Sequence, residues 1–507
     1  MNIKQAKQQL INTVKAYLQT DEYGRYLIPQ YKQRPVFLMG PPGIGKTEIM
    51  AQTASELGIG LLSYSMTHHT RQSALGLPII KQKEYGGEIF DASEYTMSEI
   101  IAAIYDLMKA SGIEKGILFL DEINCVSETL TPVMLQFLQY KVFGGKRLPD
   151  GWVVVTAGNP PEYNSSVREF DVVTWDRLKR IDVEPDLGVW KEYAAEAGLH
   201  GAALTYLGIK PQNFYRIENT AGGRSFVTAR GWEDLSRIIS VYERLGMDVD
   251  KELVSQYLQD KKTAEDFAIY YELYRKYRSD YRIEEILSGK ELQDIEKRAS
   301  AAKFDERYSL LGLLLETVSR EARELLAEDS DLISVKRTLS ELKGSSQPED
   351  DVSGMMAECV SAFDEEREKL RAANSLTSEK DSSILFRRGL FERYHIAAQN
   401  GFEGVKQSYE EDISRFKNKL NIISSHFSNM FGFCERVFGS GQELLILVTE
   451  LAADPVTARF ISEYGCEEYY RHDKELMFYE RRLEIIDELQ KIEKSINESD
   501  DQEDDAF

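Results

Sequence analysis

The sequence predicts an α/β domain with a parallel sheet between helices, followed by two all-α domains. Up to about residue 184, short β-rich apolar runs alternate with helical patterns, which is typical of a parallel sheet covered by helices. From residue 187 to about 289 the pattern is helical and strand signals disappear. Beyond residue 300, long charged helical patterns dominate. We therefore expect domains over residues 1–186, 187–290 and 291–507.

Length and composition agree with this division. A chain of 507 residues is too long for one ordinary core, so two or three domains are expected. The apolar runs fall far short of the roughly 18 residues needed to cross a bilayer, and the N-terminus has the pattern of an amphipathic helix, not of a signal peptide. The four cysteines lie far apart without a CxxC pair, which favours buried thiols over a zinc site or disulfides. We expect a soluble cytoplasmic protein without membrane association.

The net charge of −23 is unevenly distributed. Residues 301–507 contain 26 Lys and Arg against 44 Asp and Glu, so most of the acidity belongs to the C-terminal part. Such a surface repels nucleic acid and favours solubility or a basic protein partner. The acidic segment 497–507 is expected to be disordered, and the helical pattern 475–496 before it fits a bundle helix better than a short coiled coil.

Individual elements can be assigned along the chain. Segment 47–57 is expected to be a helix with one apolar face, ended by Gly58. Segments 78–90 and 140–149 each place short β segments around a Gly-Gly turn, which predicts two hairpins. Polar clusters at 343–354 and 374–383 indicate one or two flexible linkers. The five runs expected to form the sheet are PVFLM (35–39), LLSYSM (61–66), GILFLDEI (116–123), WVVVTAGN (152–159) and RIDVE (180–184).

The most informative motif is the run GPPGIGKT, from Gly40 to Thr47, between the first strand and the first helix of this pattern. It matches GxxxxGK[ST], in which glycines let backbone N–H groups approach phosphate oxygens, the lysine reaches the β- and γ-phosphates, and the hydroxyl holds Mg²⁺. The N-terminus of the following helix adds partial positive charge. The sequence therefore predicts a nucleotide site with Lys46 and Thr47 at its centre.

Residues suited to hydrolysis follow two other predicted strands. Asp121 and Glu122 end a buried strand at the sheet edge where phosphates are expected, and they are suited to ordering Mg²⁺ and to polarising the attacking water, respectively. Asn159 ends the next strand and could align water or contact the γ-phosphate, although an Asn-Pro step is often only a turn. Arg177 and Arg180 could stabilise charge on the transferred phosphoryl group, or they could be ordinary surface arginines.

Taken in order, these motifs resemble an AAA+ ATPase of the MoxR type. The resemblance spans about residues 35–240 and rests on GPPGIGKT (Walker A), ILFLDEIN (Walker B), VVVTAGNP (sensor 1), TWDRLKRI (arginine-finger region) and FVTARGWEDLS (sensor 2). It implies ATP and Mg²⁺ as ligands, with Thr47 and Asp121 at the metal and the helical segment 187–290 as a lid. The residues that it implies for nucleotide binding are Gly40, Pro41, Pro42, Gly43, Ile44, Gly45, Lys46, Thr47, Glu48 and Arg230.

The catalytic roles implied by the resemblance depend on a neighbouring subunit. Glu122 would activate water and Asn159 would sense the γ-phosphate, whereas Arg177, with Arg180 as its rival, would reach the neighbour's nucleotide. An arginine acting in trans requires assembly, most simply a closed ring, and the resemblance implies a hexamer. It also implies a partner with a von Willebrand A (VWA) domain and a protein client. The hairpins predicted at 78–90 and 140–149 would contact this client, or they could be ordinary surface hairpins. The client's identity does not follow from the motifs.

The sequence is compatible with two other functions. A motor on nucleic acid is conceivable because related rings act on DNA, and the basic pairs Lys146-Arg147 and Arg387-Arg388 offer contacts, although the overall acidity opposes it. A nucleotide-gated scaffold would use residues 301–507, where no motif is found, as its working surface.

Overall fold

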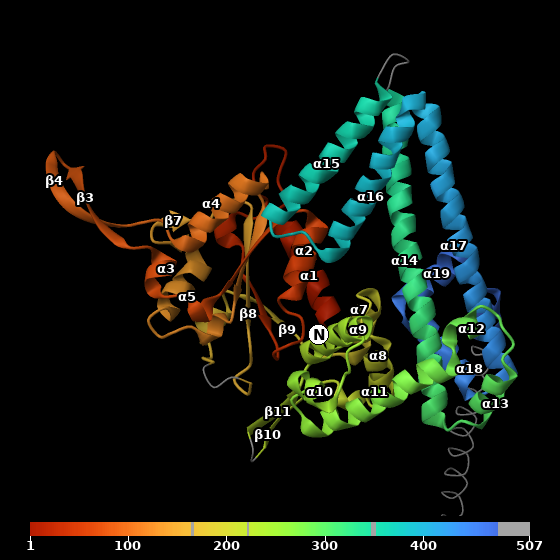
Figure 1. Ribbon diagram of the computed structural model, residues 1–507. Helices are drawn as coiled ribbons and strands as arrows, with labels where there is room; N and C mark the ends of the chain where they lie inside the picture. The colour runs from red at the N-terminus through yellow and green to blue at the C-terminus, as the bar shows by residue number, and fades with distance from the viewer. Residues whose placement is uncertain (164–166, 221–222, 346–350, 475–507) are drawn as a thin grey trace, which may run out of the picture. The chain divides into compact units, whose positions relative to one another are not determined.

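The chain folds into two compact units, each assembled from separate stretches of sequence in this computed structural model (Figure 1). The structure describes residues 1–163, 167–220, 223–345 and 351–474. The first unit consists of Met1–Trp190, Phe214–Asp234 and Ser330–Asp412. The second consists of Lys191–Asn213, Leu235–Asp329 and the chain from Ile413 onward. The predicted boundaries at residues 186 and 290 stay predictions.

The first unit is built on a five-stranded parallel sheet in the order β2-β5-β8-β1-β9. In register, Ser65 of β2 pairs with Asp121 of β5, and Met39 of β1 pairs with both Gly158 of β8 and Asp182 of β9. The C-terminal ends of all the strands therefore meet at one edge. The strands are β1 (Val36–Met39), β2 (Gly60–Ser65), β5 (Gly116–Asp121), β8 (Trp152–Gly158) and β9 (Lys179–Asp182).

Helices cover both faces of this sheet because successive strand residues point to opposite sides. On one face, Leu118 and Val154 pack with buried residues of α4 (Glu99–Ser111) and α5 (Thr131–Tyr140). On the other, Ile117 and Val155 pack with α1 (Ile3–Tyr17) and α2 (Glu48–Leu57). The strands are apolar on both faces for this reason, as expected for a parallel sheet.

Further helices and hairpins complete the first unit. Figure 1 shows the β3–β4 hairpin extending away from the sheet. The hairpins are β3 (Pro78–Tyr85) with β4 (Glu88–Tyr95), β6 (Val142–Phe143) with β7 (Lys146–Arg147), and β10 (Arg216–Thr220) with β11 (Gly223–Val227). The remaining helices wholly inside the unit are α3 (Arg71–Leu75), α6 (Val172–Trp175), α15 (Val352–Ala372) and α16 (Ser378–Ala397).

The second unit is helical in its described residues. Its buried residues include the tyrosines Tyr271 and Tyr274 of α11, whose hydroxyls donate to Glu243 at 2.9 Å and to Glu316 at 2.6 Å. Its helices are α8 (Gly201–Ile209), α10 (Lys251–Tyr257), α11 (Lys261–Tyr281), α12 (Ile283–Leu287), α13 (Gln293–Ala301), α18 (Gln442–Ala453) and α19 (Pro455–Tyr464). Among the described residues, four helices contribute to both units: α7 (Leu187–Glu196), α9 (Ala229–Leu245), α14 (Phe304–Ser345) and α17 (Gly401–Phe438).

The predicted fold class is confirmed: a parallel sheet between helices is followed by a largely helical region. The five predicted strands, the helix ended by Gly58 in the left-handed conformation, and the Gly-Gly hairpins are all present. The helix predicted at 475–496 and the acidic tail lie outside the described residues. Within the part of the chain that the structure describes, no helix combines the length and the apolar character needed to span a bilayer.

Two local predictions were wrong. The segment 187–289 contains the β10–β11 hairpin, although strand signals were expected to be absent there. The cluster 374–383 is not a flexible linker: it forms a hydrogen-bonded turn at the end of α15 and the first turns of α16. The other polar cluster, 343–354, lies partly outside the described residues.

Candidate functional site

The loop from Gly40 to Thr47 connects the end of β1 to the start of α2. Gly43 and Gly45 have φ values of 72° and 92°, a left-handed conformation that glycine adopts without strain. A Cβ atom on Gly40 would lie 2.6 Å from the Val183 carbonyl oxygen, so the close approach of β9 also requires glycine there. The loop glycines are therefore needed for the backbone path that exposes N–H groups at the helix N-terminus.

Lys46 is almost fully buried within this loop. Its Nζ donates to the carbonyl oxygens of Gly40 at 2.7 Å and Pro41 at 2.8 Å, and to Asn159 Oδ1 at 2.9 Å. These acceptors match the three protons of an ammonium group. The lysine thus links the phosphate loop to the end of β8, which the sequence placed 113 residues away.

The pKa of Lys46 is lowered to about 8, mainly by burial and to a smaller extent by the charge of Arg230, although Asp121 and Glu122 oppose the shift. Desolvation penalises the charged form of a buried lysine, so the ammonium is only weakly favoured at neutral pH. A bound phosphate would favour the charged form strongly because of its own negative charge.

The affinity for ATP is therefore expected to fall as the pH rises above about 8. Above that value the free site carries a neutral amine, and binding must take up a proton, which costs about tenfold in affinity per pH unit. Titration of a fluorescent ATP analogue between pH 7 and pH 9.5 measures the slope. In a Lys46→Arg variant the guanidinium stays charged, so its affinity should not vary with pH. A flat profile for the unmodified protein would contradict this assignment.

Thr47 and Asp121 lie side by side at the start of α2 and the end of β5. The Thr47 hydroxyl donates to Asp121 Oδ2 at 3.2 Å, and the other carboxylate oxygen accepts the Glu122 N–H at 2.9 Å. A hydroxyl and a carboxylate are oxygen ligands of the kind that Mg²⁺ prefers, and Mg²⁺ in nucleotide sites takes its other ligands from water and phosphate. The pair therefore fits the metal role predicted for it, and Mg²⁺ held there would neutralise phosphate charge.

Glu122 follows directly in a left-handed conformation, with φ 55°. Such backbone is uncommon outside glycine and is often found at functional sites. The Ser65 and Thr67 hydroxyls both donate to Glu122 Oε2 at 3.2 Å. They reach it because β2 and β5 are neighbours and end at the same edge. The carboxylate is thus held beside Asp121 in one orientation.

Asn159 is held from both sides at the end of β8. Its side-chain oxygen accepts from Lys46, and its backbone oxygen accepts from Asn124 Nδ2 at 2.8 Å. Asn124 is buried and packs closely on Gly158: a Cβ atom on Gly158 would lie 2.4 Å from Asn124 Oδ1. The amide of Asn159 is therefore fixed at the loop, where a γ-phosphate would be contacted.

The segment around Arg230 contacts the loop from the β10–β11 side of the first unit. The Arg230 N–H donates to the Gly43 carbonyl at 3.0 Å, and the Tyr215 hydroxyl donates to the Pro42 carbonyl at 2.8 Å. Thr228 packs against Gly43, since a Cβ atom on that glycine would lie 2.9 Å from it. Arg230 itself is exposed, and its charge acts on Lys46. The structure therefore brings Arg230 to the nucleotide loop.

Arg177 and Arg180 differ in their surroundings. Arg177 is exposed just after α6. Hydrogen bonds from Thr174, in addition to the positive charge of Arg177, hold the pKa of Asp171 below the ordinary value. Arg180 lies on β9, with ion-pair contacts to Asp182 at 2.7 and 2.8 Å and its guanidinium 4.7 Å from the Trp175 ring centre. Arg180 is therefore engaged by neighbouring side chains, whereas Arg177 is exposed at the helix end.

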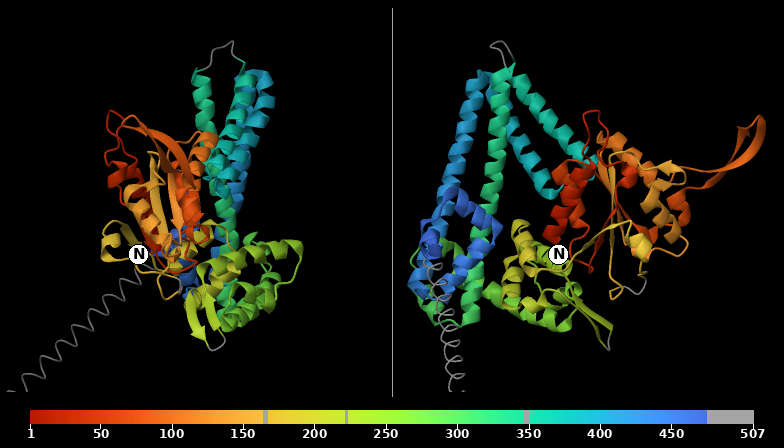
Figure 2. Two further views of the ribbon diagram at one scale, coloured as in Figure 1. Left: turned by 90° about the vertical axis from the view of Figure 1, so that its left-hand side faces the viewer. Right: turned by 180° about the vertical axis from the view of Figure 1, so that it is seen from behind.

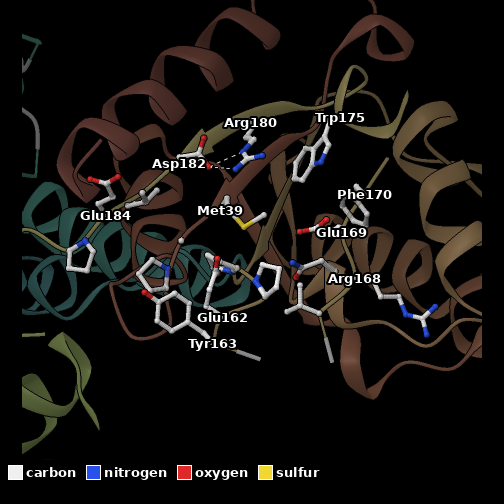
Figure 3. Close-up of a pocket in the computed structure, with 18 residues that line it drawn as sticks. Met39, Glu162, Tyr163, Arg168, Glu169, Phe170, Trp175, Arg180, Asp182 and Glu184 are labelled. Atoms are coloured by element: carbon white, nitrogen blue, oxygen red, sulfur yellow. Dashed lines mark hydrogen bonds and ion pairs between the residues drawn. The ribbon is translucent and has the colours of Figure 1, made fainter. Parts of the chain in front are cut away.

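A pocket of about 760 Å³ opens beside the start of the loop, at the ends of β1, β8 and β9 (Figure 3). Gly40 and Pro41 line it, so it adjoins the nucleotide loop. In Figure 3, Arg180 and Asp182 are joined on one side, with Trp175 beside the arginine. The space next to the loop is therefore lined by charged and aromatic side chains together.

The phosphate loop, the Thr47–Asp121 pair and the oriented Glu122 suit this site to the hydrolysis of a nucleoside triphosphate. Residues 35–178 match the family model described as AAA domain (dynein-related subfamily). This segment is an AAA domain; AAA domains bind ATP, typically with Mg²⁺. The match includes the phosphate loop, Asp121, Glu122, Asn159 and Arg177, and ends before Arg180 and Arg230. A search of curated proteins found no match.

Sequence reasoning missed four residues that the structure places in the site: Ser65, Thr67, Asn124 and Tyr215. Ser65 and Thr67 could have been found, because polar residues at the end of a strand next to β5 must lie near Glu122 once the strand order is known. Tyr215 carried no comparable signal, since its contact with Pro42 spans 173 positions.

Proposed function

We propose that this protein is a MoxR-type AAA+ ATPase that assembles into a hexameric ring and uses ATP hydrolysis to remodel or mature a protein client, together with a VWA-domain partner. The observation that carries the proposal is the cluster in which Lys46 contacts Asn159 while Thr47 contacts Asp121 beside the oriented Glu122. These are the binding, sensing and hydrolytic parts of an ATPase at one sheet edge.

The arginines support action between subunits. Arg230, from the sensor 2 segment, lies close enough to the loop for its charge to act on Lys46, whereas Arg180 is engaged by Asp182 and Trp175. Arg177 is exposed, and Val172 and Val173 at the start of the preceding helix α6 expose 83% and 57% of their surface. An exposed arginine that follows a helix with exposed valines suits a contact with a second copy of the chain.

The surface of the β3–β4 hairpin supports the proposal that the client is a protein. It exposes several large apolar side chains, which is unusual for a surface hairpin and favours contact with polypeptide. The exposed fractions are 78% for Ile80, 56% for Tyr85, 71% for Ile89 and 48% for Phe90. Its lysines Lys81 and Lys83 are paired with Glu94, which leaves the hairpin without a strongly basic face for nucleic acid.

A nucleic-acid motor is less well supported. Of the basic pairs considered for it, Arg387 and Arg388 form ion pairs with Asp331 and Asp364, so their charge is largely matched within the first unit. Lys146 and Arg147 remain exposed on β7. The C-terminal acidity adds repulsion from phosphate backbones.

Mixing two inactive variants tests the trans-acting arginine. Arg177→Ala is expected to lower the rate of ATP hydrolysis about 10³-fold, because an arginine finger stabilises transition-state charge. Lys46→Ala subunits cannot bind ATP but still offer Arg177. A mixture of the two should regain hydrolysis at mixed boundaries, measured as phosphate release at several ratios, with assembly followed by analytical ultracentrifugation.

Arg180→Ala is the matched comparison, since Arg180 is already engaged by Asp182 and Trp175. It should retain hydrolysis within about tenfold of the unmodified protein. A larger loss of ATP hydrolysis for Arg180→Ala than for Arg177→Ala would show that Arg180 is the trans-acting arginine. If the mixture stayed inactive, or if ATP hydrolysis were the same in dilute monomer as in assembled protein, action between subunits would be refuted.

A further inference from the structure

Strand β2 is an edge of the sheet, so its outward-facing backbone groups have no neighbouring strand. Open edges invite pairing with other chains, and unpaired buried backbone groups cost free energy. In this protein the C-terminal region supplies the partners. The Leu61 N–H donates to the Ala373 carbonyl at 2.9 Å, and the Leu61 carbonyl accepts from Asn374 Nδ2 at 3.3 Å.

Both partners belong to the turn between α15 and α16, which is part of the first unit (Figures 1 and 2). Asn374 has φ 53°, and asparagine is one of the few residues that tolerate this conformation. The turn is closed by hydrogen bonds from Asn374 N–H to Arg371 and from Ser375 N–H to Leu370, the pattern of a Schellman helix end. Ala373 and Ser375 are buried. The turn is therefore a fixed structure that presents one carbonyl and one amide to β2.

The other end of β2 leads to the glutamate. Leu61 and Ser65 lie four residues apart, about 13 Å along an extended strand. Ser65 and Thr67 are the residues that donate to Glu122 Oε2. A shift of β2 against β5 at Leu61 would change the Ser65–Glu122 contact because Ser65 pairs in register with Asp121. Helix α15 also contacts α4, which covers the same part of the sheet, so the turn is supported from the side.

We propose that the α15–α16 turn positions the hydrolytic glutamate, with Asn374 as the positioning residue. By binding both outward groups of Leu61, the turn fixes the edge strand, and the strand in turn fixes Ser65 and Thr67 against Glu122. This assigns part of the region after residue 300 a role in the rate of ATP hydrolysis. The inference rests on the proposed ATPase function.

Two substitutions at Asn374 test the contact. Asn374→Asp replaces the amide donor by a carboxylate that repels the Leu61 carbonyl, whereas Asn374→Gly removes the amide and keeps the left-handed turn. For Asn374→Asp we expect kcat for ATP hydrolysis to fall 3- to 10-fold, with KM and the Kd for ATP within twofold. Asn374→Gly should lower kcat less, because the Ala373 bond remains, and it still tests the inference if the aspartate variant does not fold.

Asn429→Asp is the matched control. Asn429 Nδ2 likewise donates to a backbone carbonyl, that of Leu287 at 2.7 Å, but it belongs to the second unit. Its substitution should leave kcat unchanged. Equal losses for Asn374→Asp and Asn429→Asp would overturn the proposal, since the effect would then be one of general stability.

A double-substitution cycle separates positioning from a merely structural effect. In a Ser65→Ala, Thr67→Ala background the route to Glu122 is removed, so Asn374→Asp should cause no further loss of kcat. Additive losses would overturn the proposal, as would an unchanged kcat for Asn374→Asp in the otherwise unmodified protein. If the unmodified protein hydrolysed no ATP, the proposed ATPase function itself would fail. The two failures are therefore distinguishable.

Discussion

Lys46→Ala is expected to abolish measurable nucleotide binding. The ammonium is the only side-chain cation inside the loop, and it is buried with its protons directed at the loop carbonyls and Asn159. Hydrogen bonds to charged groups contribute about 1.5–3 kcal/mol each, so the loss of two to phosphate weakens ATP binding by at least about 100-fold. Calorimetric titration with ATP and Mg²⁺ measures it.

Lys141→Ala is the control for this result. Lys141 is also buried in the first unit, and burial lowers its pKa to about 7, but its Nζ donates to Leu138 at the end of α5. Its substitution should leave ATP affinity unchanged while it alters thermal stability. An affinity within threefold of the unmodified protein for Lys46→Ala would show that nucleotide binds elsewhere.

Glu122→Gln is expected to bind ATP normally and to hydrolyse it about 10²- to 10⁴-fold more slowly, the range typical of a lost general base. Glutamine preserves the shape and can still accept the hydrogen bonds from Ser65 and Thr67. It cannot take a proton from water. Single-turnover hydrolysis with prebound ATP separates this chemical step from binding, and the ATP-locked assembly should retain its client during purification.

Glu114→Gln provides the comparison, because Glu114 precedes the same strand β5 at its opposite end. Hydrolysis in that variant should match the unmodified protein. If Glu122→Gln hydrolysed ATP at more than about one tenth of the normal rate, another group would have to activate water. Ser65 and Thr67 cannot replace it, since hydroxyls are far weaker bases than a carboxylate.

The phosphate loop, the strands and the carboxylate pair were predictable because each depends on residues close in sequence. Glycine at Gly43 and Gly45 marks a left-handed turn, and an unbroken apolar run before Asp121 marks a strand buried on both faces. The β10–β11 hairpin was missed, although the sequence has a Gly-Gly step at 222–223, because both strands are short and largely polar. Ile217 and Phe226 pair across its strands and are both apolar, whereas the central pair, Glu218 and Ser225, is polar.

The roles of the two arginines could not be separated from the sequence, where both follow the same helix. Folding distinguishes them. Strand β9 carries both Arg180 and Asp182, and the Asp182 carboxylate pairs with the Arg180 guanidinium, which also stacks on the Trp175 ring. Arg177 stays exposed at the helix end. Which of them acts on a neighbour's nucleotide stays a prediction that the mixing experiment decides.

Local patterns thus predicted an α/β domain with a phosphate loop, a pair of residues suited to a metal and a glutamate suited to hydrolysis. Propensity and periodicity act over a few residues, so they specify strands, helices and turns but not which strands become neighbours. The contacts of Lys46 with Asn159, of Glu122 with Ser65, and of Leu61 with Asn374 span 113, 57 and 313 positions, respectively. They exist because the order of strands in the sheet and the docking of one helical turn bring these residues together.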